Sequence, residues 1–388
     1  MTNLNIYNLY ISFSDSDTKI FRRILRKIIR EKPVKISLII VHLILDNNDK
    51  IEHIDNYRKE IQGEFILIRE SEVIAEPIFI KSISEIVDFF RININPGKNI
   101  FIYSGHSDGL IIGRKKAYIF LVEDFRNIIL ETLNKKCDLV ICDACLLGNI
   151  SVLDIFKDTT RFLISSPNYY NYDSILEMKN LYKYPNSKSS LINYCKRIMD
   201  EYIKLQTKTF NYKSFMASIV LYKMGPNVEK LTNMILKYKD RFGEACILTK
   251  KDDYYVDIGC EIENIRDEKD KILSKRYLED IILYRCHYKI TPQRENDLLI
   301  ILRKPYEYIN YRDNRFFKKS VIILNIKMGS YLTKNQINLT AVYMISVVTQ
   351  LVGFGMIAGT EKINWIIVPI LIASALVYTI CYYKVFSD

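Results

Sequence analysis

Several common sequence signals are absent from this chain. Residues 1–10 are too few and too polar for the apolar core of a secretory signal. We also find no internal repeat, low-complexity segment or long linker. The 56 Lys and Arg residues outnumber the 45 Asp and Glu residues, but they are scattered rather than gathered in one tract. Without a recognisable nucleic-acid motif beside this charge, we expect solvated basic faces, suited to an anionic membrane surface, and no nucleic-acid partner.

Eight cysteines and four histidines are present in 388 residues. Because no secretory signal precedes them, we expect free thiols in a reducing compartment rather than a disulfide framework. The hydrophobic content of 49% and the charged content of 26% are values of a globular protein. The length suits one large α/β domain with an appendage.

Two short apolar runs end abruptly in reactive residues. Residues 99–109 (NIFIYSGHSDG) lead to His106, and residues 138–149 (DLVICDACLLGN) lead to Cys145. Both runs read as buried strands, and the helical spacing of apolar residues over 122–134 completes a βαβ unit. Its strands are expected to be parallel, so their carboxyl ends share one edge of the sheet. His106 and Cys145 would then face each other, as in a Cys/His hydrolase.

Similar patterns predict the elements around this unit. Together they indicate an α/β fold, a three-layer αβα sandwich with a mostly parallel sheet. Strands are predicted over 4–13, 35–45, 64–68, 214–222 and 319–326, and helices over 19–31, 82–91, 187–204, 227–241 and 272–284.

The C-terminal part has a different pattern. Residues 339–359 and 363–383 carry no charge, and each is long enough to cross a hydrocarbon core of about 30 Å. Basic residues precede the first stretch, so the positive-inside rule leaves the preceding domain in the cytosol. We therefore expect a globular domain over 1–335 and a membrane anchor of two helices over 336–388. The alternative is a buried hairpin of a soluble fold.

The blocks SGHSDG and LVICDACLLGN, in this order, resemble the caspase-like clan of cysteine peptidases, and most closely the clostripain family. The resemblance covers residues 99–167. It implies a caspase-like fold, a dyad of His106 and Cys145, and cleavage of protein or peptide substrates after Arg or Lys. The chain departs from the family at Ser107, where a Gly usually follows the His and its backbone N–H helps to form the oxyanion hole.

The implied roles agree with the chemistry of the residues. Cys145 precedes a predicted helix over 150–157, whose positive dipole end favours a thiolate. The thiolate would attack a carbonyl to form an acyl-enzyme, with its own backbone N–H stabilising the oxyanion, while His106 transfers protons. Asp143 would lie on the same side as Cys145 and bind the basic side chain of the substrate. Alternatively, its carboxylate caps the following turn.

Two more expectations come from the family. Its members often cleave themselves after a basic residue between the His and the Cys, which here places the cut between Lys116 and Ala117; a charged hairpin tip is the alternative. Calcium dependence also occurs in the family. The acidic turns at 14–18 and 46–49 lack the ligand spacing of a calcium loop, so we expect capping and turn roles there, with no other metal or cofactor.

Three other interpretations stay open. Cys142 and Cys145 form a CxxC motif, as in thiol–disulfide oxidoreductases. Cys137 could join these two and His106 around zinc, although such short spacing disfavours a tetrahedron. Finally, Ser107 leaves room for a catalytically inactive scaffold at a membrane, because function depends on the site and not on the fold.

Overall fold

The computed structural model describes a large part of the first 301 residues. These are 4–31, 36–45, 54, 60–69, 72–114, 117–167, 174–184, 189–209, 217–238, 255–288 and 299–301. The chain divides into units Met1–Ile323 and Leu324–Asp388, and all described residues belong to the first. No helix in the described ranges has the length and apolar character needed to cross a bilayer. The two predicted membrane spans and the predicted strand over 319–326 lie outside the described residues.

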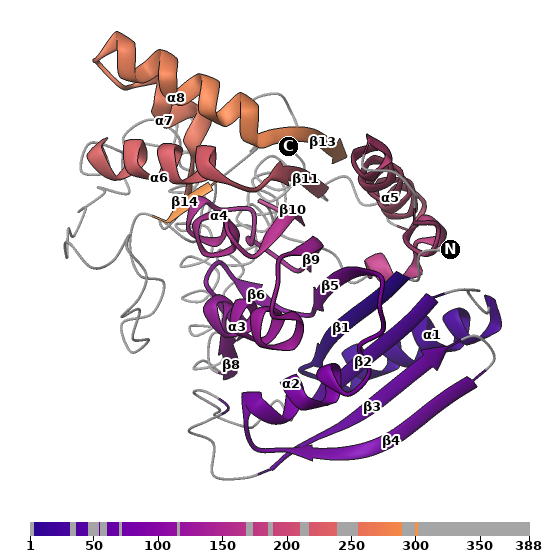
Figure 1. Cartoon of the computed structure of the whole chain (residues 1–388). Helices are drawn as coiled ribbons and strands as arrows, with labels where there is room; N and C mark the ends of the chain where they lie inside the picture. Colours follow the sequence, from indigo (N-terminus) through magenta and orange to yellow (C-terminus); the bar gives the residue numbers. More distant parts are fainter. Residues whose placement is uncertain are drawn as a thin grey trace, which may run out of the picture. The chain divides into compact units, whose positions relative to one another are not determined.

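A nine-stranded sheet forms the centre of the first unit (Figure 1). The five central strands run parallel to one another, and two antiparallel strands extend the sheet on each side. The sheet is therefore mixed, and the expectation of a mostly parallel sheet holds for its centre only. From one edge to the other the strands are β13 (Ile282–Tyr288), β11 (Ala217–Lys223), β10 (Thr160–Ser165), β9 (Cys137–Asp143), β5 (Lys98–Ser104), β1 (Leu4–Ser12), β2 (Ile36–Ile44), β3 (Ile61–Arg69) and β4 (Glu72–Ile80).

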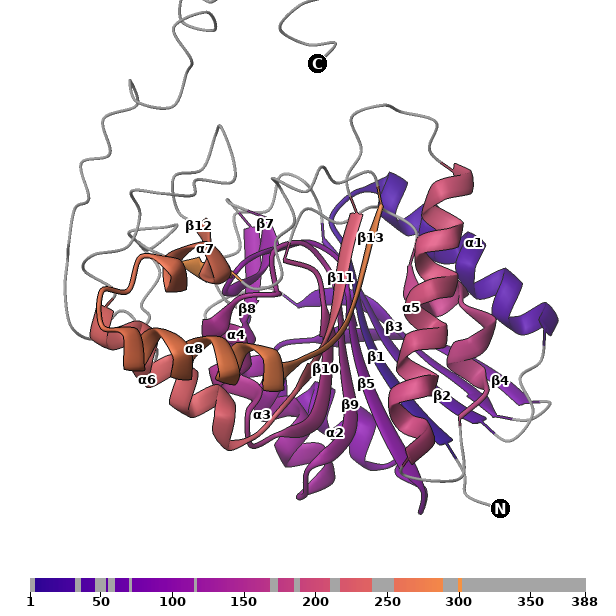
Figure 2. The ribbon, with the colours of Figure 1, turned by 90° about the horizontal axis from the view of Figure 1, so that it is seen from above.

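Helices lie on both faces of this sheet, which confirms the three-layer αβα arrangement (Figure 2). One face carries α1 (Asp15–Glu31) and α5 (Ser189–Thr209). The 3-10 helices η2 (Ile175–Glu177) and η3 (Lys179–Tyr182) lie against α1 and α5, respectively. The other side carries α2 (Ile83–Arg91), α3 (Val122–Leu133), α4 (Ile150–Phe156), α6 (Pro226–Tyr238), α7 (Ile258–Glu263) and α8 (Glu268–Ile281).

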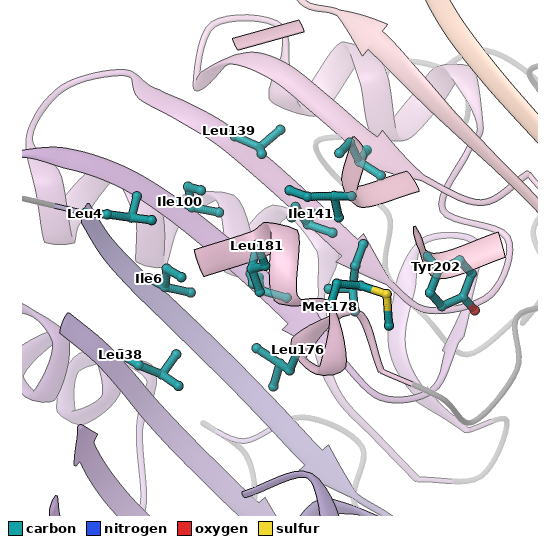
Figure 3. Packing of buried hydrophobic residues seen from close by; sticks show 14 of the residues in the cluster. Leu4, Ile6, Leu38, Ile100, Leu139, Ile141, Leu176, Met178, Leu181 and Tyr202 are labelled. Atoms are coloured by element: carbon teal, nitrogen blue, oxygen red, sulfur yellow. The ribbon is translucent and has the colours of Figure 1, made fainter. Parts of the chain in front are cut away.

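Alternation along the parallel strands sends apolar side chains to both faces. On the α1 side, Ile100 and Ile141 belong to one buried cluster with Met178, near η2 and η3 (Figure 3). On the opposite face the ring of Tyr7 stacks on that of Phe101, with 4.5 Å between centroids. Because both faces are buried, these strands read as continuous apolar runs in the sequence.

The sequence pattern missed β4 and placed the end of α8 too late. β4 is an edge strand with Pro77 and mostly exposed side chains, so it lacks the apolar signal of the inner strands. The predicted helix over 272–284 ends at Ile281, and the chain continues as β13. The apolar residues at 282–283 fit either period, and pairing with β11 decides in favour of a strand.

Two small sheets lie outside the main one. After the end of β5, the chain forms β6 (Ser107–Asp108), β7 (Ile111–Arg114) and β8 (Ala117–Leu121), which pair as an antiparallel sheet. Arg114 pairs with Ala117, as expected for a hairpin tip, while Lys116 lies outside the described residues. The second sheet pairs β12 (Tyr255–Asp257) with β14 (Leu299–Ile301).

Candidate active site

The carboxyl ends of β5 and β9 bring the histidine loop and the cysteine loop together. The two strands are parallel neighbours, with Ser104 opposite Asp143. His106 and Cys145 each follow two residues after this pair, so both leave the sheet at the same edge. The hydroxyl of Ser107 donates a hydrogen bond to the carbonyl oxygen of Cys145, which joins the two loops directly. The βαβ pattern in the sequence predicted this neighbourhood.

Cys145 is the most accessible thiol of its motif. It is half-buried, whereas Cys137 and Cys142 are fully buried, and all three are free thiols. Burial raises the pKa of the Cys137 thiol to about 12, and it raises that of Cys142 even further. A redox CxxC motif begins with a reactive thiol at the start of a helix. Here the first cysteine of the motif is inert and inside a strand, which argues against the oxidoreductase interpretation.

The backbone turns sharply immediately after Cys145. Leu146 has a φ of 58°, in the left-handed region, which costs a non-glycine residue about 1–2 kcal/mol. The turn is held by Gly148, whose N–H donates to the carbonyl oxygen of Ser166 at 2.7 Å. A Cβ atom on Gly148 would lie 2.5 Å from the backbone nitrogen of Pro167. Only glycine permits this approach to the chain after β10.

Asn149 connects the cysteine loop to the hairpin that follows the histidine. The side chain is fully buried, and its Oδ1 caps α4 by accepting from the N–H of Val152 at 3.0 Å. Its Nδ2 donates to the carbonyl oxygen of Leu146 at 2.8 Å and to that of Gly109 at 3.1 Å. One amide group therefore fixes the backbone behind both candidate catalytic residues.

The histidine loop also depends on a close approach. Gly105 has a φ of 152°, and a Cβ atom there would lie 2.9 Å from both the carbonyl oxygen of Ile11 and the hydroxyl of Tyr103. The Tyr103 hydroxyl donates to the carbonyl oxygen of His106. Burial, and then the negative charge of a Cys145 thiolate nearby, hold the pKa of Tyr103 well above its usual value. Tyr103 therefore acts as a permanent donor to the histidine backbone.

Asp17, in the first turn of α1, is a site residue that sequence analysis missed. Its Oδ2 lies 3.7 Å from Nε2 of His106 and accepts the N–H of Phe13 at 2.9 Å. The rings of Phe13 and His106 meet edge to face, with 5.6 Å between centroids. Burial alone would raise the pKa of Asp17, but the contact with His106 and the hydrogen bond from Phe13 outweigh it and lower that pKa. The carboxylate is thus charged at neutral pH beside an imidazole that is about one quarter exposed.

The expected capping role of this acidic turn is also present, through a different residue. Ser14 Oγ accepts the N–H of Asp17 at 3.3 Å and so caps α1. The strand order brings Asp17 to the site, since β1 pairs with β5 and Tyr10 lies opposite Ser104. This pairing places the start of α1 beside the loop that carries His106. The second acidic turn, at 46–49, lies outside the described residues.

Asp143 is buried at the end of β9 and holds three donors on one oxygen. Its Oδ2 accepts from Ser104 Oγ at 3.0 Å, from Ser174 Oγ at 2.6 Å and from the N–H of Ile175 at 3.0 Å. The carboxylate therefore ties β5 and β9 to the start of η2. This is a capping role, directed at a distant turn. Recognition of a basic substrate side chain by Asp143 stays a prediction.

Two further predictions concern metal binding and self-cleavage. No group of three or more His, Cys, Asp or Glu side chains suited to a metal ion occurs among the described residues. Ala117 begins β8, but the proposed cut between Lys116 and Ala117 lies at a position that the structure describes on one side only.

Comparison with known proteins identifies the fold. Neither a family model nor a curated protein matches the sequence. Among solved structures, the chain is similar to iotapain, a secreted C11 cysteine protease from Bacteroides thetaiotaomicron, with a TM-score of 0.57, 11% identity and coverage of 77% of this chain and 93% of that chain. A secreted C11 cysteine protease from the same organism, in complex with an irreversible peptide inhibitor, gives a TM-score of 0.59, 10% identity and coverage of 79% and 94%.

A third structure, an inactive zymogen of a C11 protease from Parabacteroides distasonis, gives a TM-score of 0.53, 13% identity and coverage of 79% and 93%. The chain thus has the fold of clostripain-like, or C11, cysteine proteases, as the two sequence blocks predicted. At this level of identity the likeness establishes the fold, and the activity must be argued from the site.

Proposed function

We propose that this chain is a cysteine endopeptidase, with Cys145 as the nucleophile and His106 as the general acid and base. The observation that carries the proposal is the shared edge of β5 and β9. There the two residues leave paired strands at equivalent positions, and the contact between Ser107 and Cys145 joins their loops. The fold shared with C11 proteases adds independent support.

The reaction follows from these roles. The thiolate Sγ of Cys145 attacks the carbonyl carbon of the scissile peptide bond, and a thioester forms as the C–N bond breaks. His106 gives its proton to the leaving amine. Water then adds to the thioester, His106 takes a proton from that water, and the C–S bond breaks to return the thiolate. Asp17 lies beside the imidazole and holds it in place.

Ser107, the departure from the family pattern, is compatible with this activity. Its hydroxyl donates a hydrogen bond to the carbonyl oxygen of Cys145, so the side chain that glycine lacks is accommodated within the site. The backbone N–H groups of Cys145 and Ser107 are our candidates for stabilising the oxyanion. The second candidate function, an inactive scaffold, depends on the opposite assumption that Ser107 distorts these donors.

The proposed specificity is for Arg or Lys before the scissile bond. Its support is the D-A-C sequence together with the carboxylate of Asp143 at the edge that carries Cys145. Negative charge beside a cleavage site favours a cationic side chain. The hydrogen bonds already made by Asp143 assign it a structural task as well, so the two tasks must be separated by experiment.

We further propose that residues 336–388 anchor the protein in a membrane and leave the catalytic unit in the cytosol. The uncharged stretches over 339–359 and 363–383, and the basic residues before them, support this arrangement. Self-cleavage between Lys116 and Ala117 is proposed for the hairpin of β7 and β8, which directly follows the histidine loop.

The test is hydrolysis of fluorogenic peptides that end in Arg, Lys or Asp by the full chain in detergent, with and without calcium. Cleavage after Arg or Lys that disappears in Cys145→Ala is the expected result. Cleavage after Asp would retain the dyad and overturn the specificity. No hydrolysis by a folded protein with an unreactive Cys145 would favour the scaffold.

A further inference from the structure

A second histidine is buried near the candidate active site and is absent from the proposed chemistry. His42, on β2, is fully buried, and its Nε2 lies 2.8 Å from Oγ of Ser12, the last residue of β1. Its Nδ1 faces Oε2 of Glu64, on β3, at 3.6 Å, slightly longer than an ordinary hydrogen bond. The other oxygen of Glu64 pairs with Arg22 of α1. We call Ser12, His42, Glu64 and Arg22 the His42 network.

The charges in this network define its hydrogen bonds. Burial lowers the pKa of His42, so its imidazole is neutral. The contact with His42 outweighs burial and, together with Arg22, lowers the pKa of Glu64 to about 2, so its carboxylate is charged. A neutral imidazole beside a carboxylate keeps its proton on the nitrogen that faces the carboxylate. Nε2 of His42 is then an acceptor, and the hydroxyl of Ser12 donates to it.

Aromatic rings hold the imidazole in this orientation. The centroid of the Phe21 ring lies 4.0 Å from that of the His42 ring. The ring of Tyr10 meets the His42 ring edge to face, with 5.6 Å between centroids. Both rings come from elements that lead to the candidate site, since Tyr10 is on β1 and Phe21 is on α1. The imidazole of His42 therefore packs between β1 and α1.

The His42 network is connected to Asp17 in two ways, through Phe13 and through α1. Ser12 directly precedes Phe13, whose N–H donates to Asp17 and whose ring packs against His106. Arg22 lies on α1, the helix that carries Asp17 in its first turn. The backbone of Ser12 is also fixed, because its carbonyl oxygen accepts the N–H of Leu45 at 2.9 Å. The network thus fixes the end of β1 and the start of α1 together.

We propose that the His42 network positions Asp17 against His106 and so orients the imidazole of the dyad. This inference rests on the proposed function of His106 and Cys145. Although the order Ser12, His42, Glu64 resembles a hydrolase triad, Ser12 is fully buried and is no second nucleophile. Its members are positioning residues, which act on the reaction only through Asp17.

The alternative is that the network contributes to stability alone, and the chain offers a matched control. Asp138, at the amino end of β9, pairs with Lys98 at 3.4 Å and with Arg161 at 3.6 Å. It also accepts the N–H of Asn99 at 3.3 Å. Asp138→Asn therefore removes a partly buried carboxylate charge at the opposite end of the sheet from the candidate site.

The test measures alkylation of Cys145 by iodoacetamide as a function of pH in the full chain, after subtraction of the Cys145→Ala background. The readout reports the thiolate–imidazolium pair and requires no peptide hydrolysis. The variants are Ser12→Ala, Glu64→Gln and Asp138→Asn, each with its melting temperature. We expect the first two to lower the rate near pH 6 by about threefold or more, and Asp138→Asn to leave the profile unchanged.

A double-mutant cycle tests the route through Asp17. In an Asp17→Asn background, Ser12→Ala is expected to have no further effect on the profile, because the carboxylate through which Ser12 is proposed to act is already lost. Profiles of Ser12→Ala and Glu64→Gln that superpose on the wild type would overturn the inference alone, as would a full effect of Ser12→Ala in the Asp17→Asn background. If alkylation of Cys145 in the wild-type protein has the pH dependence of an ordinary thiol, the proposed dyad is overturned and the inference with it.

Discussion

Asp17 and His106 face each other at the edge of the sheet, with 3.7 Å between the carboxylate Oδ2 and the imidazole Nε2. The carboxylate is held by the N–H of Phe13, so the acid is fixed before it meets the histidine. This contact orients the imidazole of His106 for the proton transfers proposed above. The proposed dyad is thus extended to three residues from three elements.

Replacing Asp17 by Asn is expected to lower kcat by about 10- to 100-fold, part of the 10²–10⁴-fold that a positioned acid–base group supplies. KM should change little, because the carboxylate orients the histidine and is not expected to touch the substrate. Kinetics on the best basic peptide measure both constants. A kcat equal to that of the wild type would remove Asp17 from the mechanism.

Asn149 gives a second prediction, in which capping and bridging can be separated. Asn149→Asp keeps an oxygen that can cap α4, but it loses the amide that donates to Leu146 and Gly109. Asn149→Ala loses both, at a cost of about 0.5–2 kcal/mol for the cap alone. We expect both variants to lose activity at least several-fold, measured as kcat on folded protein. Wild-type activity in Asn149→Asp would show that only the cap matters.

The glycine of the cysteine loop gives a prediction about stability. At Gly148 a new Cβ atom would meet backbone atoms of Ser166 and Pro167, which cannot rotate away as a side chain could. Gly148→Ala is therefore expected to destabilise the fold by about 1–3 kcal/mol or more, the usual effect of overpacking. Gly225→Ala is the control, because no atom lies within 4 Å of its Cβ position and only its φ of 141° opposes the change. Urea unfolding that ranks Gly225→Ala as the more damaging change would contradict the packing argument.

Glu64 gives a prediction about pH. Its pKa is lowered from 4.5 to about 2, so its stabilising contribution is present above pH 4.5 and is lost as the pH falls through about 2. Glu64→Gln should therefore reduce the free energy of unfolding at pH 7, and the difference from the wild type should shrink as the pH falls from 4.5 towards 2. Denaturant unfolding at several pH values measures this difference. A difference that is constant across that range would show that the charge of Glu64 contributes nothing.

The sequence predicted the centre of the fold and the meeting of the histidine and cysteine loops, because both depend on local patterns. A buried parallel strand leaves a continuous apolar run, and the reactive residues follow directly after two such runs. Edge strand β4 left no such signal, since Pro77 interrupts it and water covers most of its side chains. The central position of the strands in the sheet thus decides how clearly they appear in the sequence.

The contacts of Asp17 and Asn149 could not be read from sequence spacing. Asp17 reaches His106 only because β1 inserts beside β5, and Asn149 reaches Gly109 only because the turn after β6 lies beside the start of α4. Asp143 shows the converse, since its position beside Cys145 suggested substrate binding while the fold adds Ser174 and Ile175 as partners. Roles that depend on strand order and loop packing require the three-dimensional structure.

The most direct test of the central claim is mass spectrometry of the full chain after incubation with a peptidyl acyloxymethyl ketone that carries Lys before the reactive group. This reagent reacts with a cysteine that attacks a bound carbonyl. We predict one adduct, on Cys145, that is absent in Cys145→Ala and strongly reduced in His106→Ala. A folded wild-type protein that remains unlabelled, or that is labelled on another cysteine, would contradict the account.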